Sequence, residues 1–68
     1  MNRVREFRVA RDWTQVKLAK RAKVSFSTIS LLERELRGAS PLVRGRLARA
    51  LEVPEDVLFD GEPRKKAS

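Results

Sequence analysis

Residues 15–34 read QVKLAKRAKVSFSTISLLER, and this stretch decides the fold. An α-helix turns about 100° per residue, so residues three, four and seven apart share a side. The first half of the stretch places Leu18, Ala19 and Ala22 on one side. The second half begins at Ser25 and places Ile29, Leu32 and Leu36 on another. The pattern predicts two short helices joined by a tight turn at residues 22–24.

The side of the second helix opposite its apolar face is short and mostly polar. Stepping around the helix places Ser27 and Arg34 outward, Ser30 and Leu31 beside them, and Phe26 and Arg37 at one border. Small side chains allow a helix to approach a DNA groove closely, and arginine can donate two hydrogen bonds to a guanine edge or bind phosphate. The alternative is an ordinary solvated surface on which an arginine falls by chance.

Length and composition limit the chain to one small domain without metal or thiol chemistry. It has 68 residues, no cysteine and no histidine, so it has no disulfide, no thiolate or imidazole ligand, and no histidine for acid–base catalysis. No apolar run approaches the roughly 20 residues that span a bilayer, and the N-terminus lacks the apolar segment of a signal peptide. We expect a cytoplasmic protein that binds no cofactor, membrane or small-molecule substrate.

Positive charge is concentrated in the first part of the chain. Residues 1–49 carry 13 Lys/Arg and 4 Asp/Glu, residues 50–63 carry 5 Asp/Glu and no Lys/Arg, and residues 64–68 carry three basic residues, giving +7 in all. A basic body favours a polyanionic partner such as nucleic acid, although a small domain can be basic without one. The basic residues are spread over several short helices, which disfavours a membrane-surface helix.

One further helix is expected before this stretch, and capping residues mark the starts of the two helices within it. Asn2 can cap a first helix that runs to about Arg11, with Val4, Phe7 and Ala10 on one face. Trp13 is interpreted as a half-buried wedge between the first two helices, with a platform for base stacking as the alternative. Thr14 and Ser25 are N-caps of the second and third helices. We expect the third helix to run to Arg37, with Gly38 as its left-handed terminal residue.

Two more helices complete an all-α domain. Ser40 and Pro41 form a start signal for a fourth helix, whose inward residues are Val43, Leu47, Ala50 and Leu51, with Arg44, Arg46 and Arg49 largely outside. Pro54 opens a short fifth helix, PEDVLF. The expected architecture is a compact five-helix helix-turn-helix domain over residues 1–60, followed by a disordered basic tail over residues 61–68.

A set of positions spread through the chain completes a known pattern. They are Thr14-Gln15, Leu18-Ala19, Ala22, Val24-Ser25, Ser27-Thr28-Ile29-Ser30, Leu32-Glu33-Arg34, Leu47-Ala48, Val53-Pro54 and Leu58-Phe59. Together these residues resemble the phage repressor/Cro-type (Xre-like) helix-turn-helix family of bacterial and viral regulators. The resemblance covers about residues 2–60. It implies a five-helix fold, a third helix that reads DNA, and a dimer that binds a palindromic operator.

The resemblance also implies roles for individual residues. The base-reading positions are Phe26, Ser27, Leu31 and Arg34. The positions near the phosphate backbone are Gln15, Lys17, Lys23, Ser25, Thr28, Ser30 and Arg37. Arg8 and Glu33 match a partly buried ion pair between the first and third helices. Backbone N–H groups at the starts of the second and third helices would add phosphate contacts.

The sequence departs from the family at three points. Lys23 and Glu35 stand where glycine is usual, and the second departure suggests a longer third helix. Phe26 and Leu31 are apolar where polar side chains are frequent. They can contact a thymine methyl but cannot donate hydrogen bonds, so shape readout would contribute more than usual.

The leading hypothesis is a transcriptional regulator, acting as a repressor, that binds double-stranded DNA in a sequence-specific manner. The alternative is a protein-interaction module or antitoxin-like adaptor, in which Phe26 and Leu31 contact a protein. We do not expect an enzyme, because the serines of the third helix have no base to activate them. For a homodimer, the candidate apolar surface is Val57, Leu58, Phe59 and Leu42.

Overall fold

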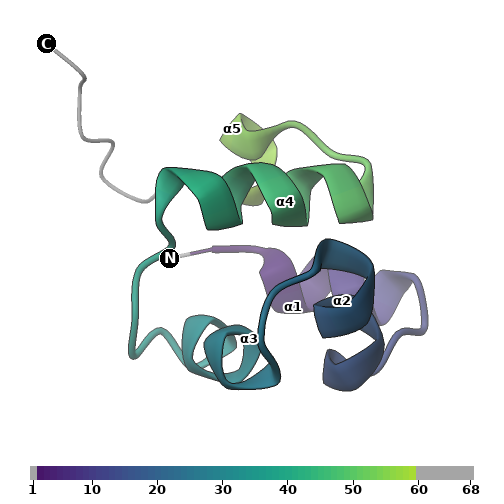
Figure 1. Ribbon diagram of the computed structural model, residues 1–68. Helices are drawn as coiled ribbons and strands as arrows, with labels where there is room; N and C mark the ends of the chain where they lie inside the picture. The colour runs from purple at the N-terminus through teal and green to yellow at the C-terminus, as the bar shows by residue number, and fades with distance from the viewer. Residues whose placement is uncertain (1, 60–68) are drawn as a thin grey trace, which may run out of the picture.

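Five helices and no strands make up residues 2–59, the part of the chain that the computed structural model describes. The helices are α1 (Val4–Ala10), α2 (Gln15–Ala22), α3 (Phe26–Glu33), α4 (Pro41–Leu51) and α5 (Glu55–Leu58). In Figure 1, α4 and α5 lie on one side of the layer formed by α1, α2 and α3. The predicted all-α, five-helix fold is confirmed. The tail expected at residues 61–68 lies outside the described residues.

One hydrophobic core receives side chains from all five helices. Its buried members are Val4, Leu18, Ala19, Ala22, Ile29, Leu32, Leu47, Ala48, Leu51, Leu58 and Phe59. The apolar faces predicted for α2 and for the first two turns of α3 therefore both point inward. Between residues 2 and 59 no helix is long and apolar enough to cross a membrane.

Hydroxyl side chains fix the starts of α2, α3 and α4, as the sequence predicted. Thr14 Oγ1 accepts a hydrogen bond from the Lys17 N–H at 3.0 Å, and Ser25 Oγ accepts one from the Thr28 N–H at 3.2 Å. Ser40 does the same for α4, with Pro41 as the first helical residue. Each bond satisfies an N–H group that has no acceptor within the helix.

Asn2 caps α1 in a different geometry from the one expected. Its Oδ1 accepts from the Val4 N–H at 3.1 Å, although Arg3 occupies the N-cap position itself. The Asn2 Nδ2 donates to the Leu32 carbonyl at 3.0 Å, so one side chain joins the start of α1 to the last turn of α3. The Arg3 N–H donates to the Leu58 carbonyl at 2.7 Å, which joins the same segment to α5.

The expected extension of α3 to Arg37 is wrong. The helix ends at Glu33, and the chain turns at Glu35, which is left-handed with φ 58°. Gly38 is not left-handed, and Leu36, expected on the apolar face, is 63% exposed. A left-handed non-glycine residue costs about 1 kcal/mol. Burying one leucine contributes about 1.5–3 kcal/mol, so bringing α4 onto the core outweighs that cost.

A non-glycine residue with a left-handed backbone conformation follows each of the first four helices. They are Asp12, Lys23, Glu35 and Glu52, with φ between 57° and 61°. Lys23 is the C-cap of α2 at the turn that leads into α3, so the chain adopts the usual glycine conformation there without glycine. At about 1 kcal/mol each, four such residues cost about 4 kcal/mol together, which is large beside the net stability of so small a domain.

A buried ion pair joins α1 to α3. Arg8 Nε lies 2.6 Å from Glu33 Oε2, and Arg8 Nη2 donates to Glu33 Oε1 at 3.0 Å. The two side chains are only 13% and 3% exposed. The Arg8 Nη1 donates to the Trp13 carbonyl at 2.7 Å, and Gln15 Nε2 donates to Glu33 Oε1 at 3.0 Å. The pair implied by the resemblance is thus present and extends to the start of α2.

We predict that Lys23→Gly stabilises the domain, because glycine adopts a left-handed conformation without steric cost. The free energy of unfolding should rise by about 0.5–1 kcal/mol in urea titrations. Lys20→Gly, the same change inside α2, is the matched control and should lower it by about 1 kcal/mol. Equal effects of the two substitutions would contradict the assigned conformation.

We predict that Glu33→Gln lowers the free energy of unfolding by about 3 kcal/mol, because the buried Arg8 charge loses its counter-charge. The double variant Arg8→Met/Glu33→Leu removes both charges and should recover most of that loss. Circular dichroism during urea unfolding measures the free energy of unfolding of both variants. A Glu33→Gln variant as stable as the wild type would show that an unpaired Arg8 charge at this site carries no large free-energy cost.

Candidate nucleic-acid interface

The outward side of α3 carries the side chains that the sequence placed there. Ile29 and Leu32 are fully buried, whereas Ser27 and Arg34 on the opposite side are exposed. Phe26 is 49% exposed at the start of the helix. Leu31, Ser30 and Thr28 are half-buried along its borders. Phe26, Ser27 and Leu31 thus belong to one short helix and Arg34 is its C-cap, although their contacts with DNA remain a prediction.

The start of α3 combines a fixed cap with unpaired backbone donors. Ser25 Oγ accepts from the Thr28 N–H and also donates to Thr28 Oγ1 at 2.8 Å. Because Thr28 Oγ1 accepts that bond, its own hydrogen can be donated to another group. Phe26 and Ser27 occupy the first turn, where helix geometry gives backbone N–H groups no intrahelical acceptor. Such a turn can bind an anion.

Gln15 has a structural contact that the sequence reasoning did not anticipate. It is half-buried, and its Nε2 donates to Glu33 Oε1 at 3.0 Å. An amide nitrogen carries two hydrogens, so one remains for a phosphate oxygen when the other is donated to Glu33. The ion pair can therefore orient the residue expected to bind the DNA backbone.

Trp13 lies at the corner between α1 and α2, half-buried against the core, as predicted. Three cations surround its ring, namely Arg11 at 5.5 Å, Lys17 at 6.0 Å and Arg21 at 5.2 Å from the centroid. These distances suit cation–π contacts, which compete with base stacking for the ring face. The arrangement favours the structural role and gathers positive charge beside the start of α2.

The cationic residues expected near DNA lie at different positions relative to α3. Arg34 is the C-cap of α3 and is exposed. Arg37 is also exposed, but it lies in the segment between α3 and α4 and not on α3 as expected. Lys23 is exposed in the turn before α3. These side chains lie at both ends of α3 and just beyond it.

Other arginines donate to backbone carbonyls, which the sequence reasoning missed. Beyond Arg8, the Arg11 Nη2 donates to the Leu51 carbonyl at 2.5 Å, the Arg44 Nε to the Ala39 carbonyl at 3.3 Å, and the Arg46 Nη1 to the Lys23 carbonyl at 2.8 Å. Arg44, expected outside α4, is half-buried with its guanidinium 4.6 Å from the Phe59 ring centroid. Part of the positive charge is therefore used to join helices.

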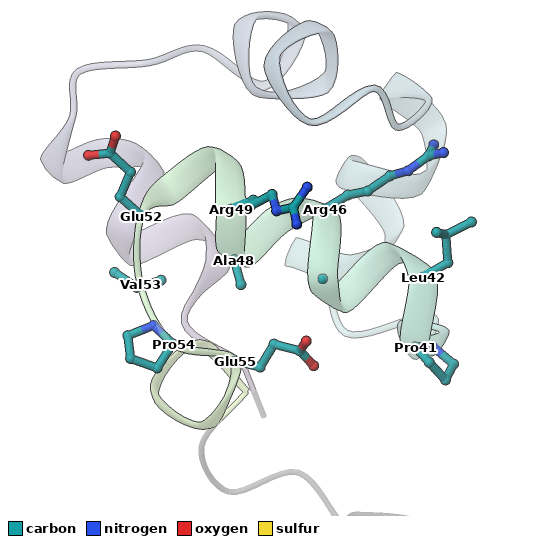
Figure 2. A pocket seen from close by; sticks show the side chains of 10 residues that line it. Pro41, Leu42, Arg46, Ala48, Arg49, Glu52, Val53, Pro54 and Glu55 are labelled. Carbon is teal, nitrogen blue, oxygen red and sulfur yellow. The ribbon is translucent and has the colours of Figure 1, made fainter.

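A shallow groove of about 660 Å³ runs between α4 and the segment that leads into α5 (Figure 2). Its lining includes the apolar residues Pro41, Leu42, Ala48, Val53 and Pro54, and the charged residues Arg46, Arg49, Glu52 and Glu55. Leu58 and Phe59, which were expected as possible dimer contacts, are buried in the core instead. Leu42 and Val57 remain exposed, at 63% and 40%.

Comparison with known families agrees with this geometry. Residues 4–58, from the first residue of α1 to the last of α5, match the family model described as Helix-turn-helix. No match is found among curated proteins. The matched family is non-catalytic and DNA-binding, which supports the expectation that the protein is not an enzyme. The chain belongs to the Cro/C1-type, Xre-like helix-turn-helix family.

Proposed function

We propose that this protein is a transcriptional repressor that binds double-stranded DNA with α3 in the major groove. The observation that carries the proposal is the outward side of α3. It is short and mostly polar, it ends at the C-cap Arg34, and it lies opposite the buried residues Ile29 and Leu32. The major groove is about 12 Å wide and admits one helix. A domain bound there blocks access to the DNA that it covers.

Recognition of the DNA sequence would combine one strong polar contact to a base with apolar contacts to others. Arg34 can donate two hydrogen bonds to O6 and N7 of a guanine. Phe26 and Leu31 can contact thymine methyl groups, and Ser27 can donate to either kind of base edge. Because few donors face the bases, the shape of the duplex would contribute to specificity.

Phosphate contacts would supply most of the affinity. Lys17 on α2, Lys23 before α3 and Arg37 after α3 are exposed cations, and the first turns of α2 and α3 present backbone N–H groups. The remaining amide hydrogen of Gln15 and the Thr28 hydroxyl add neutral donors, with Ser30 at the border of the helix. Binding of this kind weakens steeply as salt rises, because counterions are released from the DNA.

We further propose that two copies bind a palindromic operator as a homodimer. A symmetric dimer needs a surface that is complementary to itself. The groove beside α4 offers apolar residues between side chains of opposite charge, and Leu42 and Val57 are exposed nearby in the same α4–α5 part of the molecule. Leu42 and Val57 support the dimer, because exposed apolar side chains of one copy can pack against those of the other.

We predict that Arg34→Ala removes specificity more than affinity. Duplexes enriched by the wild-type protein from a random pool should bind the variant about 10–100-fold more weakly, because a bidentate guanine contact is lost. A scrambled duplex should lose only a few-fold. Arg37→Ala is the matched control, since loss of a phosphate contact weakens both duplexes alike and reduces the salt slope by about 1. Equal losses for the two variants would overturn the assigned roles.

We predict that the enriched duplexes contain two inverted half-sites about 10 base pairs apart, centre to centre. Sedimentation of the protein on such a duplex should give two copies per site. A single asymmetric half-site occupied by one copy would exclude the proposed dimer.

Phe26 favours one alternative, because an aromatic ring that is 49% exposed can also contact a protein. In that case the domain would be an interaction module or an antitoxin-like adaptor. The two functions differ in binding to mixed genomic DNA fragments at low salt, which the repressor should bind. Complete absence of binding would reject the proposed function and favour the interaction module.

A further inference from the structure

We infer that Arg46 of α4 is a positioning residue that sets the direction in which α3 leaves α2. The inference rests on the proposed function, because the direction of α3 matters most when this helix reads DNA. Arg46 lies on a different helix and 23 positions beyond Lys23, to whose carbonyl its side chain donates.

The contact is made at the turn itself. The Arg46 Nη1 donates to the Lys23 carbonyl at 2.8 Å, and in Figure 2 the Arg46 side chain extends away from Glu55 on the other side of the groove. The N–H groups of Lys23 and Val24 both donate to the Ala19 carbonyl. The backbone of the turn is thus held from α2 through its N–H groups and from α4 through a carbonyl.

The carbonyl of Lys23 is a sensitive point, because its direction is determined by the ψ angle of that residue. Lys23 is left-handed with φ 57° and ψ 44°, a conformation that a non-glycine residue adopts against its preference. A guanidinium fixed on this oxygen holds the peptide plane between residues 23 and 24. The helix that starts two residues later, at Phe26, follows the orientation of that plane.

A small rotation at the turn has a large effect at the far end of α3. This helix has eight residues, so it is about 12 Å long at 1.5 Å per residue. A rotation of about 10° at its start would move its end by about 2 Å. Arg34 lies at that end, and a displacement of this size separates a guanidinium from a guanine edge.

Arg49 provides a matched control for Arg46. It lies on α4 less than one turn further along, is also exposed, and lines the same groove, as Figure 2 shows. Within residues 2–59 no hydrogen bond joins its side chain to the turn at Lys23. Replacing either arginine by alanine removes one charge from the same helix, so only the contact with the turn differs.

The first test compares Arg46→Ala with Arg49→Ala on two duplexes, one enriched by the wild-type protein from a random pool and one scrambled. Arg46→Ala should weaken binding of the enriched duplex about 10-fold and of the scrambled duplex no more than about 3-fold. Arg49→Ala should weaken both to the same small extent. Proportional losses for Arg46→Ala, with a salt slope reduced by about 1, would identify a phosphate contact and overturn the inference. Equal behaviour of the two variants would also overturn it.

The second test combines Arg46→Ala with Lys23→Gly. Glycine adopts the left-handed conformation on its own, so the turn should depend less on Arg46. In the Lys23→Gly background, Arg46→Ala should therefore reduce binding of the enriched duplex only about 2–3-fold, and the double-mutant cycle removes the effect of the lost lysine charge. Additive losses would overturn the inference.

A third measurement needs no DNA. Residual dipolar couplings of the free protein report the orientation of α3 relative to α2, and circular dichroism verifies that each variant is folded. The orientation should change in Arg46→Ala and stay unchanged in Arg49→Ala; the same orientation in both variants overturns the inference. If the wild type binds no duplex, the proposed function fails, while the dipolar couplings still decide the role of Arg46.

Discussion

The arrangement of the first three helices depends on the bidentate pair between Arg8 and Glu33. Its charges are almost completely buried, and removing two ions from water costs several kcal/mol each. The attraction between them largely offsets that cost, so the pair adds little net stability compared with an apolar contact. The pair instead fixes the orientation of α1 relative to α3, because a planar guanidinium binds a carboxylate in few geometries. The further bonds to the Trp13 carbonyl and from Gln15 extend that constraint to α2.

Polar contacts hold α3 at its two ends, and the core holds its middle. Glu33, the last residue of the helix, is bound by Arg8, and the turn before its first residue is bound by Arg46. Between them, Ile29 and Leu32 are fully buried. An eight-residue helix is too short to be stable in isolation, so its orientation must come from such tertiary contacts. A helix held in this way can present a short outward side in a fixed geometry.

Sequence reasoning predicted the features that depend on local chemistry. The starts of α2, α3 and α4 follow from hydroxyl caps at Thr14, Ser25 and Ser40, because a cap satisfies a backbone donor only two or three residues away. The inward positions of α2 followed from helical periodicity. The outward side of α3 was predicted for the same reason, since a helix with one buried side exposes the other.

The features that were missed depend on contacts between distant segments. The sequence pattern favoured a helix to Arg37 with a left-handed Gly38 after it, but the cost of a left-handed Glu35 is smaller than the gain from packing α4. The same limit applies to Arg46. No periodicity or motif distinguishes it from Arg49, because only the folded chain brings the Lys23 carbonyl within reach of one and not the other.

Positive charge therefore has two uses in this domain, and composition alone cannot separate them. Arg8, Arg11, Arg44 and Arg46 each donate to a backbone carbonyl, which in every case lies at the end of a helix or in a connecting segment. A guanidinium has five N–H donors, so one bond to a carbonyl leaves its charge and other donors intact. Arginine can thus join helices while still contributing to the positive field that attracts DNA. A lysine ammonium would contribute the same positive charge but lacks the planar set of donors of a guanidinium. In this small, cysteine-free domain, the arginines therefore contribute both to the fold and to the proposed interface.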